Sequence, residues 1–202
     1  SSLGSKFNIG DKVFGMIKGL PEYQTGTLSQ FAIVDEDICS LCPPSISLDL
    51  CAAIPLTGIT SIKAFDKCQL KQGERVLIIG GSGGIGTIAI QLAKYIYGAS
   101  VIVTTASTPE KIAKCYELGA TKVINYRETN YIHSLKSTNQ TFHVILDCVG
   151  DASKVTDLLC PTGRLCSIVV SPTSESIREW ISEQNFSPSK LKCGLYKILH
   201  SK

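Results

Sequence analysis

The sequence carries little net charge and no long uninterrupted apolar run. Its 202 residues have a formal net charge of +3, and Lys and Arg form no block. A basic patch would be expected in a protein that binds nucleic acid or an anionic membrane surface, so neither partner is predicted. No apolar run suggests a membrane span, and the start, "SSLGSKFNIGD", lacks the charged-then-apolar pattern of a signal peptide. We therefore expect a cytoplasmic protein without a membrane span, with organellar targeting left open.

The nine cysteines lack the pattern of a disulfide framework or a zinc site. Cys148 and Cys166 lie in the apolar runs "VILDCVG" and "RLCSIVV", where a thiol behaves as a small hydrophobic residue. The count is odd and the chain is long enough to bury a core without crosslinks, which favours a reducing compartment. Cys39 and Cys42 form a single C-x-x-C. Because a closed zinc site needs four ligands and no second pair follows at finger-like spacing, no metal is predicted.

The first part of the chain is typical of a small all-β unit. From Lys6 to about Pro55, short strand-like pieces alternate with turn residues. The next stretch, "SLDLCAAIPLTGITSIKAF", has a helical pattern that we expect to be interrupted at Pro55. The β unit is predicted to be barrel-like, and its β-forming residues are Val13, Phe14, Phe31, Ile33 and Val34.

From Arg75 onward, strand and helix patterns alternate. The runs "RVLIIG" and "SVIVTT" are continuously apolar, as expected for parallel strands covered on both faces. Helical spacing separates them, and "PEKIAKCYELG" predicts a second helix. Further strands are expected at "KVIN", "HVILDCVG" and "GRLCSIVV", and a helix around Ile177–Ile181. The series predicts an α/β fold with a doubly wound parallel sheet and right-handed crossovers.

A glycine-rich turn joins the first of these strands to its helix. It contains G-x-G-x-x-G at Gly81, Gly83 and Gly86, and also G-x-x-x-G-x-G at Gly80, Gly84 and Gly86. A turn at this position exposes unpaired backbone N–H groups at the start of a helix, where the helix dipole favours an anion. Since the motif follows a strand, opens a helix and begins a βαβ series, it predicts a dinucleotide site.

The second spacing is that of the short-chain dehydrogenases, which also need a downstream Y-x-x-x-K. No tyrosine after the turn meets this requirement. The residue four positions on is not lysine after Tyr116, Tyr126, Tyr131 or Tyr196. The short-chain interpretation is therefore rejected.

The second strand indicates which dinucleotide is bound. An NAD site usually ends this strand with Asp or Glu, which holds the ribose 2′-hydroxyl. Here the strand ends in "VIVTTAST", with hydroxyl side chains at Thr104, Thr105 and Ser107 in place of the acid. Lys111 and the Tyr126–Arg127 pair follow. Hydroxyls and cations suit a 2′-phosphate, so the predicted cofactor is NADPH.

The chain resembles the medium-chain dehydrogenase/reductase superfamily, and within it the zinc-independent quinone oxidoreductase (ζ-crystallin-like) branch. The resemblance covers about Phe7 to Val170, and the matching stretches follow the order of the family. They are "FNIGDKVFG", "LSQFAIVDEDICSLCPPSISLDLCAAIPLTGITSIKAF", "LKQGERVLIIGGSGGIGTIAIQLAK", "ELGATKVINYRE", "FHVILDCVG" and "GRLCSIV". The resemblance implies a partial GroES-like β domain (residues 1–58), a Rossmann domain (59–172) and a C-terminal segment (173–202) that returns to the β domain.

The resemblance also implies roles for individual residues. Thr60, in "PLTGITS", matches a threonine near the nicotinamide end of the cofactor. The pyrophosphate loop is matched by Ser82, Gly83, Gly84, Ile85 and Gly86. The positions that hold the 2′-phosphate are matched by Ser107, Lys111 and Tyr126. The loop after the fourth strand, which borders the cofactor, is matched by Val149 and Gly150.

Family chemistry implies hydride transfer from NADPH to a quinone or an α,β-unsaturated carbonyl. No metal is implied, because the Cys and His ligands of the zinc-dependent relatives have no match in the sequence. No catalytic residue is assigned, because the family's substrate wall precedes "GDKVFG" and is missing here. Two alternatives stay open: a non-catalytic NADPH-binding redox sensor or scaffold, and an enoyl-reductase domain of a multidomain synthase. The family often dimerises through Rossmann edge strands, and "RLCSIVV" is a plausible edge for a homodimer.

Overall fold

The computed structural model describes residues 6–17 and 26–169. These residues form two compact units, the first ending at Ile59 and the second beginning at Thr60. Each unit is described by itself. The predicted domain boundaries stay predictions, and the predicted segment 173–202, with its helix around Ile177–Ile181, lies outside the described residues.

The first unit contains one antiparallel pair of short strands among its described residues. β1 (Val13–Gly15) pairs with β2 (Cys39–Leu41), and a 3-10 turn, η1 (Glu36–Ile38), precedes β2. The prediction of strand residues at 31–34 was wrong: this segment has no strand, and Phe31 and Ile33 are 89% and 94% exposed. β-forming side chains stabilise a strand only when a neighbouring strand pairs with it, and the described residues place none beside this segment.

The helix that follows, α1 (Leu48–Lys67), runs through Pro55 without a break. The predicted interruption was therefore wrong. Proline removes one N–H from the helix ladder, but the turns on either side keep theirs, and the carboxyl-terminal turns bury Ala64 and Phe65 in the core of the second unit. α1 is also long and apolar enough to cross a membrane by length and composition alone, although a third of the stretch is buried in the protein. Helices that pack in a protein core pass the same test, so the absence of a membrane span stays a prediction.

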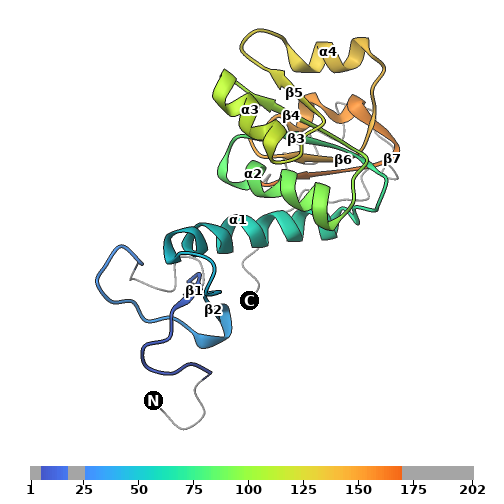
Figure 1. The fold of residues 1–202 in the computed structure, drawn as a ribbon. Coiled ribbons are helices and arrows are strands. Elements are labelled where there is room, and N and C mark those ends of the chain that lie inside the picture. Colours follow the sequence, from blue (N-terminus) through green and yellow to red (C-terminus); the bar gives the residue numbers. More distant parts are fainter. Residues whose placement is uncertain (1–5, 18–25, 170–202) are drawn as a thin grey trace. The chain divides into compact units, whose positions relative to one another are not determined.

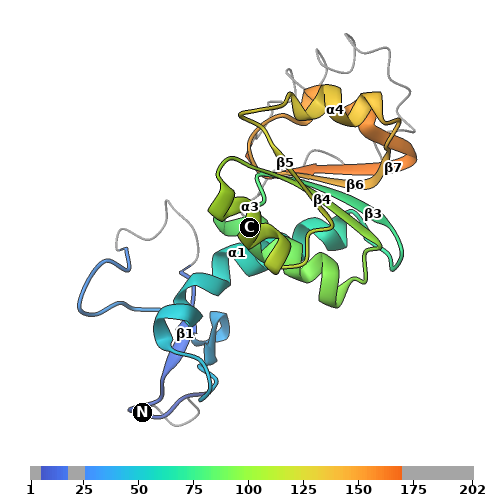
Figure 2. The ribbon, with the colours of Figure 1, turned by 45° about the horizontal axis from the view of Figure 1, so that its top comes forward.

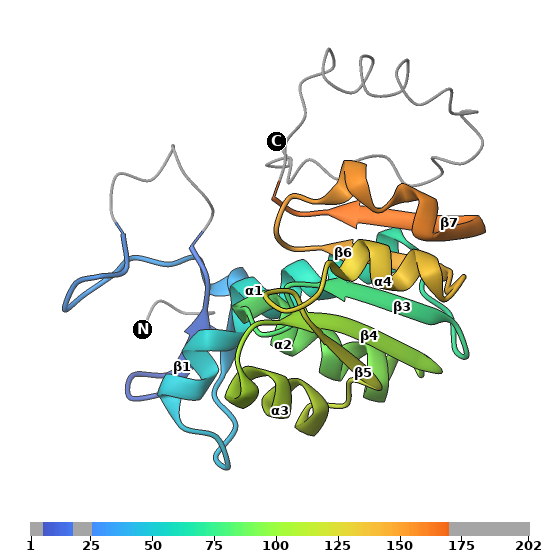
Figure 3. The same cartoon turned by 90° about the horizontal axis from the view of Figure 1, so that it is seen from above.

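The second unit is built on a five-stranded parallel sheet with the order β5-β4-β3-β6-β7 (Figure 1; Figure 3). The chain begins at the central strand, moves outward through two strands, and returns to the other side of the centre for the last two. This is the predicted doubly wound, Rossmann-type arrangement, and the prediction is confirmed. The strands are β3 (Arg75–Ile79), β4 (Val101–Ala106), β5 (Lys122–Asn125), β6 (Phe142–Asp147) and β7 (Leu159–Ser167).

Helices cover both faces of this sheet (Figure 2). α2 (Gly84–Gln91), which continues as the π-helical turn η2 (Leu92–Ile96), and α3 (Pro109–Glu117) pack on one face. α4 (Tyr131–Ser137) and the 3-10 turn η4 (Thr156–Leu158) pack on the other. Successive side chains of a strand point to opposite faces of the sheet. Because helices cover both faces, the side chains on both must be apolar, which explains the continuous apolar runs. In β3, Val76 and Ile78 join the first core and Leu77 and Ile79 the second.

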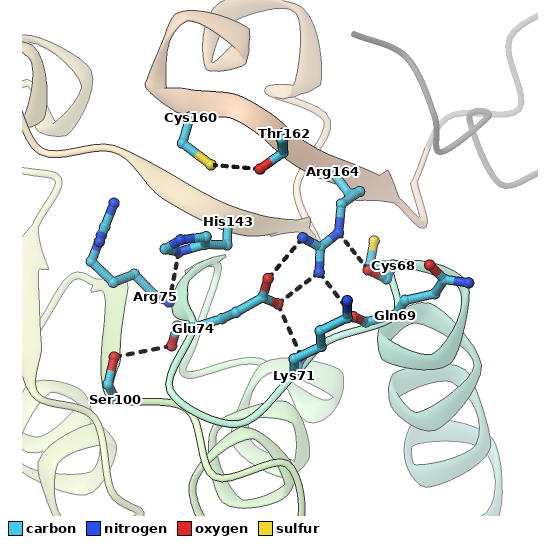
Figure 4. Close-up of polar contacts among 10 residues, drawn as sticks. All are labelled: Cys68, Gln69, Lys71, Glu74, Arg75, Ser100, His143, Cys160, Thr162 and Arg164. Atoms are coloured by element: carbon cyan, nitrogen blue, oxygen red, sulfur yellow. Dashed lines mark hydrogen bonds and ion pairs between the residues drawn. The ribbon is translucent and has the colours of Figure 1, made fainter. Parts of the chain in front are cut away.

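A partly buried ion pair between Arg164 and Glu74 lies at the amino-terminal ends of the strands (Figure 4). Arg164, on β7, donates to both carboxylate oxygens of Glu74 at 2.8 and 2.6 Å, and to the carbonyl oxygens of Cys68 and Gln69. Burial alone would raise the pKa of Glu74, but these hydrogen bonds and the charge of Arg164 outweigh it and hold the pKa below its ordinary value. The cluster ties β7, the start of β3 and the segment after α1 together. It lies at the amino-terminal ends of the strands, whereas the glycine-rich turn lies at their carboxyl-terminal ends.

β7 is the last strand at one edge of the described sheet. It contains the segment "RLCS" of the predicted dimer edge, which extends past the strand. The homodimer itself stays a prediction.

Candidate functional site

The carboxyl ends of β3 and β6 define the candidate site. These neighbouring parallel strands continue in opposite directions across the sheet, since β3 leads to β4 on one side and β6 leads to β7 on the other. A topological switch of this kind leaves a crevice outside the strand ends, where open α/β sheets bind their ligands. The glycine-rich turn follows β3, and the loop with Val149 and Gly150 follows β6.

The turn after β3 is held against the neighbouring strand β4. The Gly80 N–H donates to Thr105 Oγ1 at 2.9 Å, and the Gly81 N–H donates to the Thr105 carbonyl oxygen at 3.1 Å. Gly80 has a φ of +88°, a conformation that favours glycine. A Cβ added to Gly81 would lie 1.9 Å from Thr104 Oγ1, so only glycine fits there. Gly80 and Gly81 are therefore required by the backbone conformation and the packing of this turn.

The amino terminus of α2 rests directly on this turn. A Cβ on Gly86 would lie 2.2 Å from the Gly80 carbonyl oxygen, so helix and turn approach each other as closely as their backbones allow. Gly83 is the N-cap residue of α2 and provides no side-chain hydrogen bond to the helix. The N–H groups of the first helical turn therefore have no cap from their own helix and can bind an anion.

Gly83 differs from Gly81 and Gly86 because the protein leaves room for a side chain there. A Cβ there would lie no closer than 3.4 Å to the Gly80 carbonyl oxygen, an ordinary contact, and its φ of −80° suits any residue. Packing therefore does not require glycine at this exposed position. A ligand that must approach the backbone closely would require it, so the donor groups present fit a dinucleotide pyrophosphate.

The hydroxyl groups at the end of β4 divide into two sets, which the sequence did not distinguish. Thr104 is fully buried, and its Oγ1 donates to the Ile78 carbonyl oxygen at 2.6 Å. Thr105 is also buried and accepts from the glycine turn, as described above. The interpretation of both hydroxyls as part of a 2′-phosphate site is therefore wrong, because they hold β3 and its turn. The sequence did carry a sign of this structural role, because the two hydroxyl side chains lie within an otherwise apolar strand.

The other predicted 2′-phosphate residues lie at the carboxyl ends of β4 and β5. Ser107 directly follows β4 and is 7% exposed. Lys111 lies in the first turn of α3 with an exposed side chain, and its N–H donates to the N-cap residue Thr108. Tyr126 follows β5, is half exposed, and its N–H donates to the Ala106 carbonyl oxygen at 3.1 Å. The structure thus places Ser107, Lys111 and Tyr126 on one edge, and their binding role stays a prediction.

The loop after β6 is organised by Asp147, a residue to which the sequence analysis gave no role. This fully buried carboxylate accepts four hydrogen bonds. Its Oδ1 accepts from the N–H groups of Val149 and Gly150 at 3.0 and 2.9 Å, and its Oδ2 from the Ala152 N–H and the Ser167 hydroxyl, both at 2.9 Å. A charged residue ending a strand of apolar residues was the available signal.

The same loop lies beside the glycine turn. A Cβ on Gly80 would lie 2.9 Å from Cγ1 of Val149, and the Cys148 N–H donates to the Ile79 carbonyl oxygen. Gly150 has a φ of +101°, which favours glycine. Asp151 accepts from the Tyr131 hydroxyl at 2.8 Å and so joins the loop to α4. The structure therefore brings Val149 and Gly150 close to the predicted pyrophosphate loop.

Thr60, the predicted residue for the nicotinamide end, lies on α1 next to Ser61. The Ser61 hydroxyl is buried and contacts the Ile85 carbonyl oxygen at 3.4 Å. This contact brings α1 to the first turn of α2. Thr60 is half buried at this junction, within the second unit.

The described residues do not provide the ligand set of a zinc site. Across residues 6–17 and 26–169, no three His, Cys, Asp or Glu side chains gather where they could hold a metal ion. Catalytic zinc sites in proteins use three protein ligands and structural ones use four. No chemical step is therefore derived through zinc for these residues.

A profile of the family described as zinc-binding dehydrogenases matches residues 84–189, more than half of the chain. The chain therefore belongs to this family, whose members include quinone oxidoreductases and alkenal/one oxidoreductases of the medium-chain dehydrogenase/reductase superfamily. The predicted resemblance to that superfamily is confirmed. The family's description mentions zinc, and residues 6–17 and 26–169 contain no cluster of three side chains that could bind it.

Three similar proteins illustrate the range of the family. The 2-methylene-furan-3-one reductase of Solanum lycopersicum is 32% identical over 84% of this chain and 43% of its own length. The chloroplastic NADPH-dependent alkenal/one oxidoreductase of Arabidopsis thaliana is 30% identical over 77% of this chain and 39% of its own. The structure of the quinone oxidoreductase from Coxiella burnetii has a TM-score of 0.76 at 32% identity, over 89% of this chain and 55% of its own. The chain thus spans about half the length of the proteins it matches. Family membership supports an oxidoreductase role.

Proposed function

We propose that this chain provides the dinucleotide-binding part of an NADPH-dependent, zinc-independent reductase that transfers hydride to a quinone or an α,β-unsaturated carbonyl. The observation that carries the proposal is the close approach of α2 to the glycine turn at Gly81 and Gly86, with room for a side chain left at Gly83. The relatives support the substrate class, since their names specify an alkenal/one, a furanone with a conjugated methylene group and a quinone.

In this proposal each described segment has one task. The amides of the first turn of α2 bind the pyrophosphate, and the edge with Ser107, Lys111 and Tyr126 binds the 2′-phosphate. Asp147 fixes the loop with Val149 and Gly150 beside the turn, and that loop keeps water from the cofactor. The bound cofactor would supply the hydride, and the protein would supply position and orientation.

The first expected result is NADPH binding with turnover. Calorimetry on the full chain should register heat with NADPH, and a simple quinone or enone should then consume NADPH, seen as loss of its ultraviolet nicotinamide absorbance. Binding without turnover across several quinones and enones would support the alternative of a non-catalytic NADPH sensor. Absence of heat with NADPH from a folded chain would contradict both functions.

The second expected result concerns the 2′-phosphate. Replacing Lys111 by alanine should weaken NADPH binding about ten-fold, the effect of losing one charge-assisted hydrogen bond, and leave NADH binding nearly unchanged. The matched control is Lys114→Ala, on the same helix, where the lysine forms an exposed ion pair with Glu117 at 2.9 Å. Lys114→Ala should change neither affinity. An equal loss of NADPH and NADH binding in Lys111→Ala would show that the lysine does not contact the 2′-phosphate.

A further inference from the structure

The first unit brings two cysteine thiols together, away from the candidate nucleotide site. The Sγ atoms of Cys42 and Cys51 lie 3.0 Å apart. In the sequence, the obvious pair is Cys39 and Cys42, three residues apart. In the structure Cys39 is buried beside Gly15, whose added Cβ would lie 3.0 Å from its sulfur. The fold therefore pairs Cys42 with Cys51, nine residues further along the chain.

The backbone on both sides of this pair is hydrogen-bonded. The Cys42 N–H donates to the Lys12 carbonyl oxygen at 2.7 Å, which extends the pairing of β1 with β2. The Cys51 N–H donates to the Ser47 carbonyl oxygen at 3.0 Å in the first turn of α1. Between them, the Ile46 N–H closes a turn onto the Pro43 carbonyl oxygen. The two sulfur atoms are therefore held face to face by secondary structure, and little chain ordering is needed to join them.

The two thiols differ in how reagents can reach them. Cys42 is half buried, so part of this residue is open to solvent. Cys51 is fully buried behind it. The hydrogen bond to Cys42, together with burial, raises the pKa of the Cys51 thiol above its ordinary value. Cys42 is thus the residue that reacts first, and Cys51 is placed to react with the product.

We propose that Cys42 and Cys51 form a two-electron redox site that a hydroperoxide converts to a disulfide. The Cys42 thiolate attacks one peroxide oxygen, the O–O bond breaks, and Cys42 becomes a sulfenic acid while hydroxide leaves. The Cys51 sulfur then attacks the Cys42 sulfur, the S–O bond breaks, and the second oxygen leaves as water. In total, two thiols lose two electrons and two protons, and hydrogen peroxide is reduced to two molecules of water.

Only a small movement of the two sulfur atoms is needed to form the disulfide. A disulfide has an S–S distance of about 2.05 Å, so the two sulfur atoms must approach each other by about 1 Å. The new bond would join the end of β2 to the first turn of α1. A dithiol reductant would reverse it, with the electrons returning by thiol–disulfide exchange. The proposal does not depend on the proposed reductase function.

The test uses the full chain, reduced and then treated with one equivalent of hydrogen peroxide. Remaining thiols are alkylated, and cleavage before aspartate gives the peptide 37–48, which carries Cys39 and Cys42, and the peptide 49–65, which carries Cys51. We expect the two peptides to be recovered joined, with Cys39 alkylated and with two of the nine thiols, those of Cys42 and Cys51, lost to alkylation. Dithiothreitol should restore both thiols. Recovery of unlinked peptides, with Cys51 alkylated and Cys42 overoxidised to a sulfinic acid, would overturn the proposal.

Variants distinguish this pair from the alternatives. Cys39→Ala should keep the link, and Cys42→Ala should abolish it. In Cys51→Ala, the Cys42 sulfenic acid should persist and be trapped by dimedone. Cys160→Ala is the control for an accessible thiol, because the Cys160 sulfur contacts the Thr162 hydroxyl at 3.8 Å rather than a second sulfur, and it should keep the link. A link that survives in Cys42→Ala would assign the chemistry to Cys39 and contradict the proposal.

Discussion

Replacing Gly86 by alanine should abolish NADPH binding and destabilise the second unit. The added Cβ would lie 2.2 Å from the Gly80 carbonyl oxygen and 2.6 Å from the Gly81 Cα. Both are backbone atoms, so no side-chain rotation can relieve the contact, and α2 must move away from the turn. Overpacking of this kind costs about 1–3 kcal/mol or more. Thermal unfolding followed by circular dichroism, together with calorimetry with NADPH, measures both effects.

Gly83→Ala is the informative partner of this variant. The structure leaves room for its methyl group, so we expect a loss of stability of about 1 kcal/mol or less, typical of an N-cap substitution. NADPH binding should still fall at least about ten-fold, because the methyl group keeps a pyrophosphate from approaching the amides. A Gly83→Ala chain that binds NADPH like the wild type would contradict the phosphate site. A Gly86→Ala chain of unchanged stability would contradict the close packing of helix and turn.

These two glycines show what a motif can and cannot predict. The spacing of Gly81, Gly83 and Gly86 predicted a strand, a tight turn and a helix, because each motif position has a fixed place in such a unit. The motif does not tell which glycines serve packing and which serve a ligand. That distinction depends on atoms of neighbouring segments, such as Thr104 Oγ1 beside Gly81. Only the folded chain supplies those atoms.

The sheet was predictable for a related reason. Parallel strands covered on both faces must be apolar throughout, so β3 and β4 are visible as continuous runs without knowledge of their neighbours. The first unit has no such signal. Phe31 and Ile33 have strong β propensity, yet propensity reflects packing against a paired strand, and the described residues give them none. Cys42 and Cys51 likewise lie on different elements, and no sequence spacing joins them.

Asp147 holds the loop after β6, although the sequence analysis gave it no role. Its fully buried carboxylate accepts hydrogen bonds from Val149, Gly150, Ala152 and Ser167. Asp147→Asn keeps the shape but replaces one acceptor oxygen with an amino group. If that group faces Ser167, the hydroxyl can turn and accept, but the Ala152 N–H is left without an acceptor. In the other orientation, two backbone N–H groups are left without one.

We therefore expect Asp147→Asn to lower the free energy of unfolding by about 3 kcal/mol, since a buried donor loses its partner and the remaining bonds lose a charged acceptor. The displaced loop should also weaken NADPH binding. Ser167→Ala, which removes one of the four bonds, should cost about 1 kcal/mol. Asp157→Asn is the surface control: its carboxylate is 64% exposed and pairs with Lys136, so the change should be less than about 1 kcal/mol. Urea unfolding of the three variants measures the order. If Asp147→Asn unfolds at the same urea concentration as Asp157→Asn, the buried carboxylate does not hold the loop, and the crevice at the ends of β3 and β6 must be organised by the glycine turn alone.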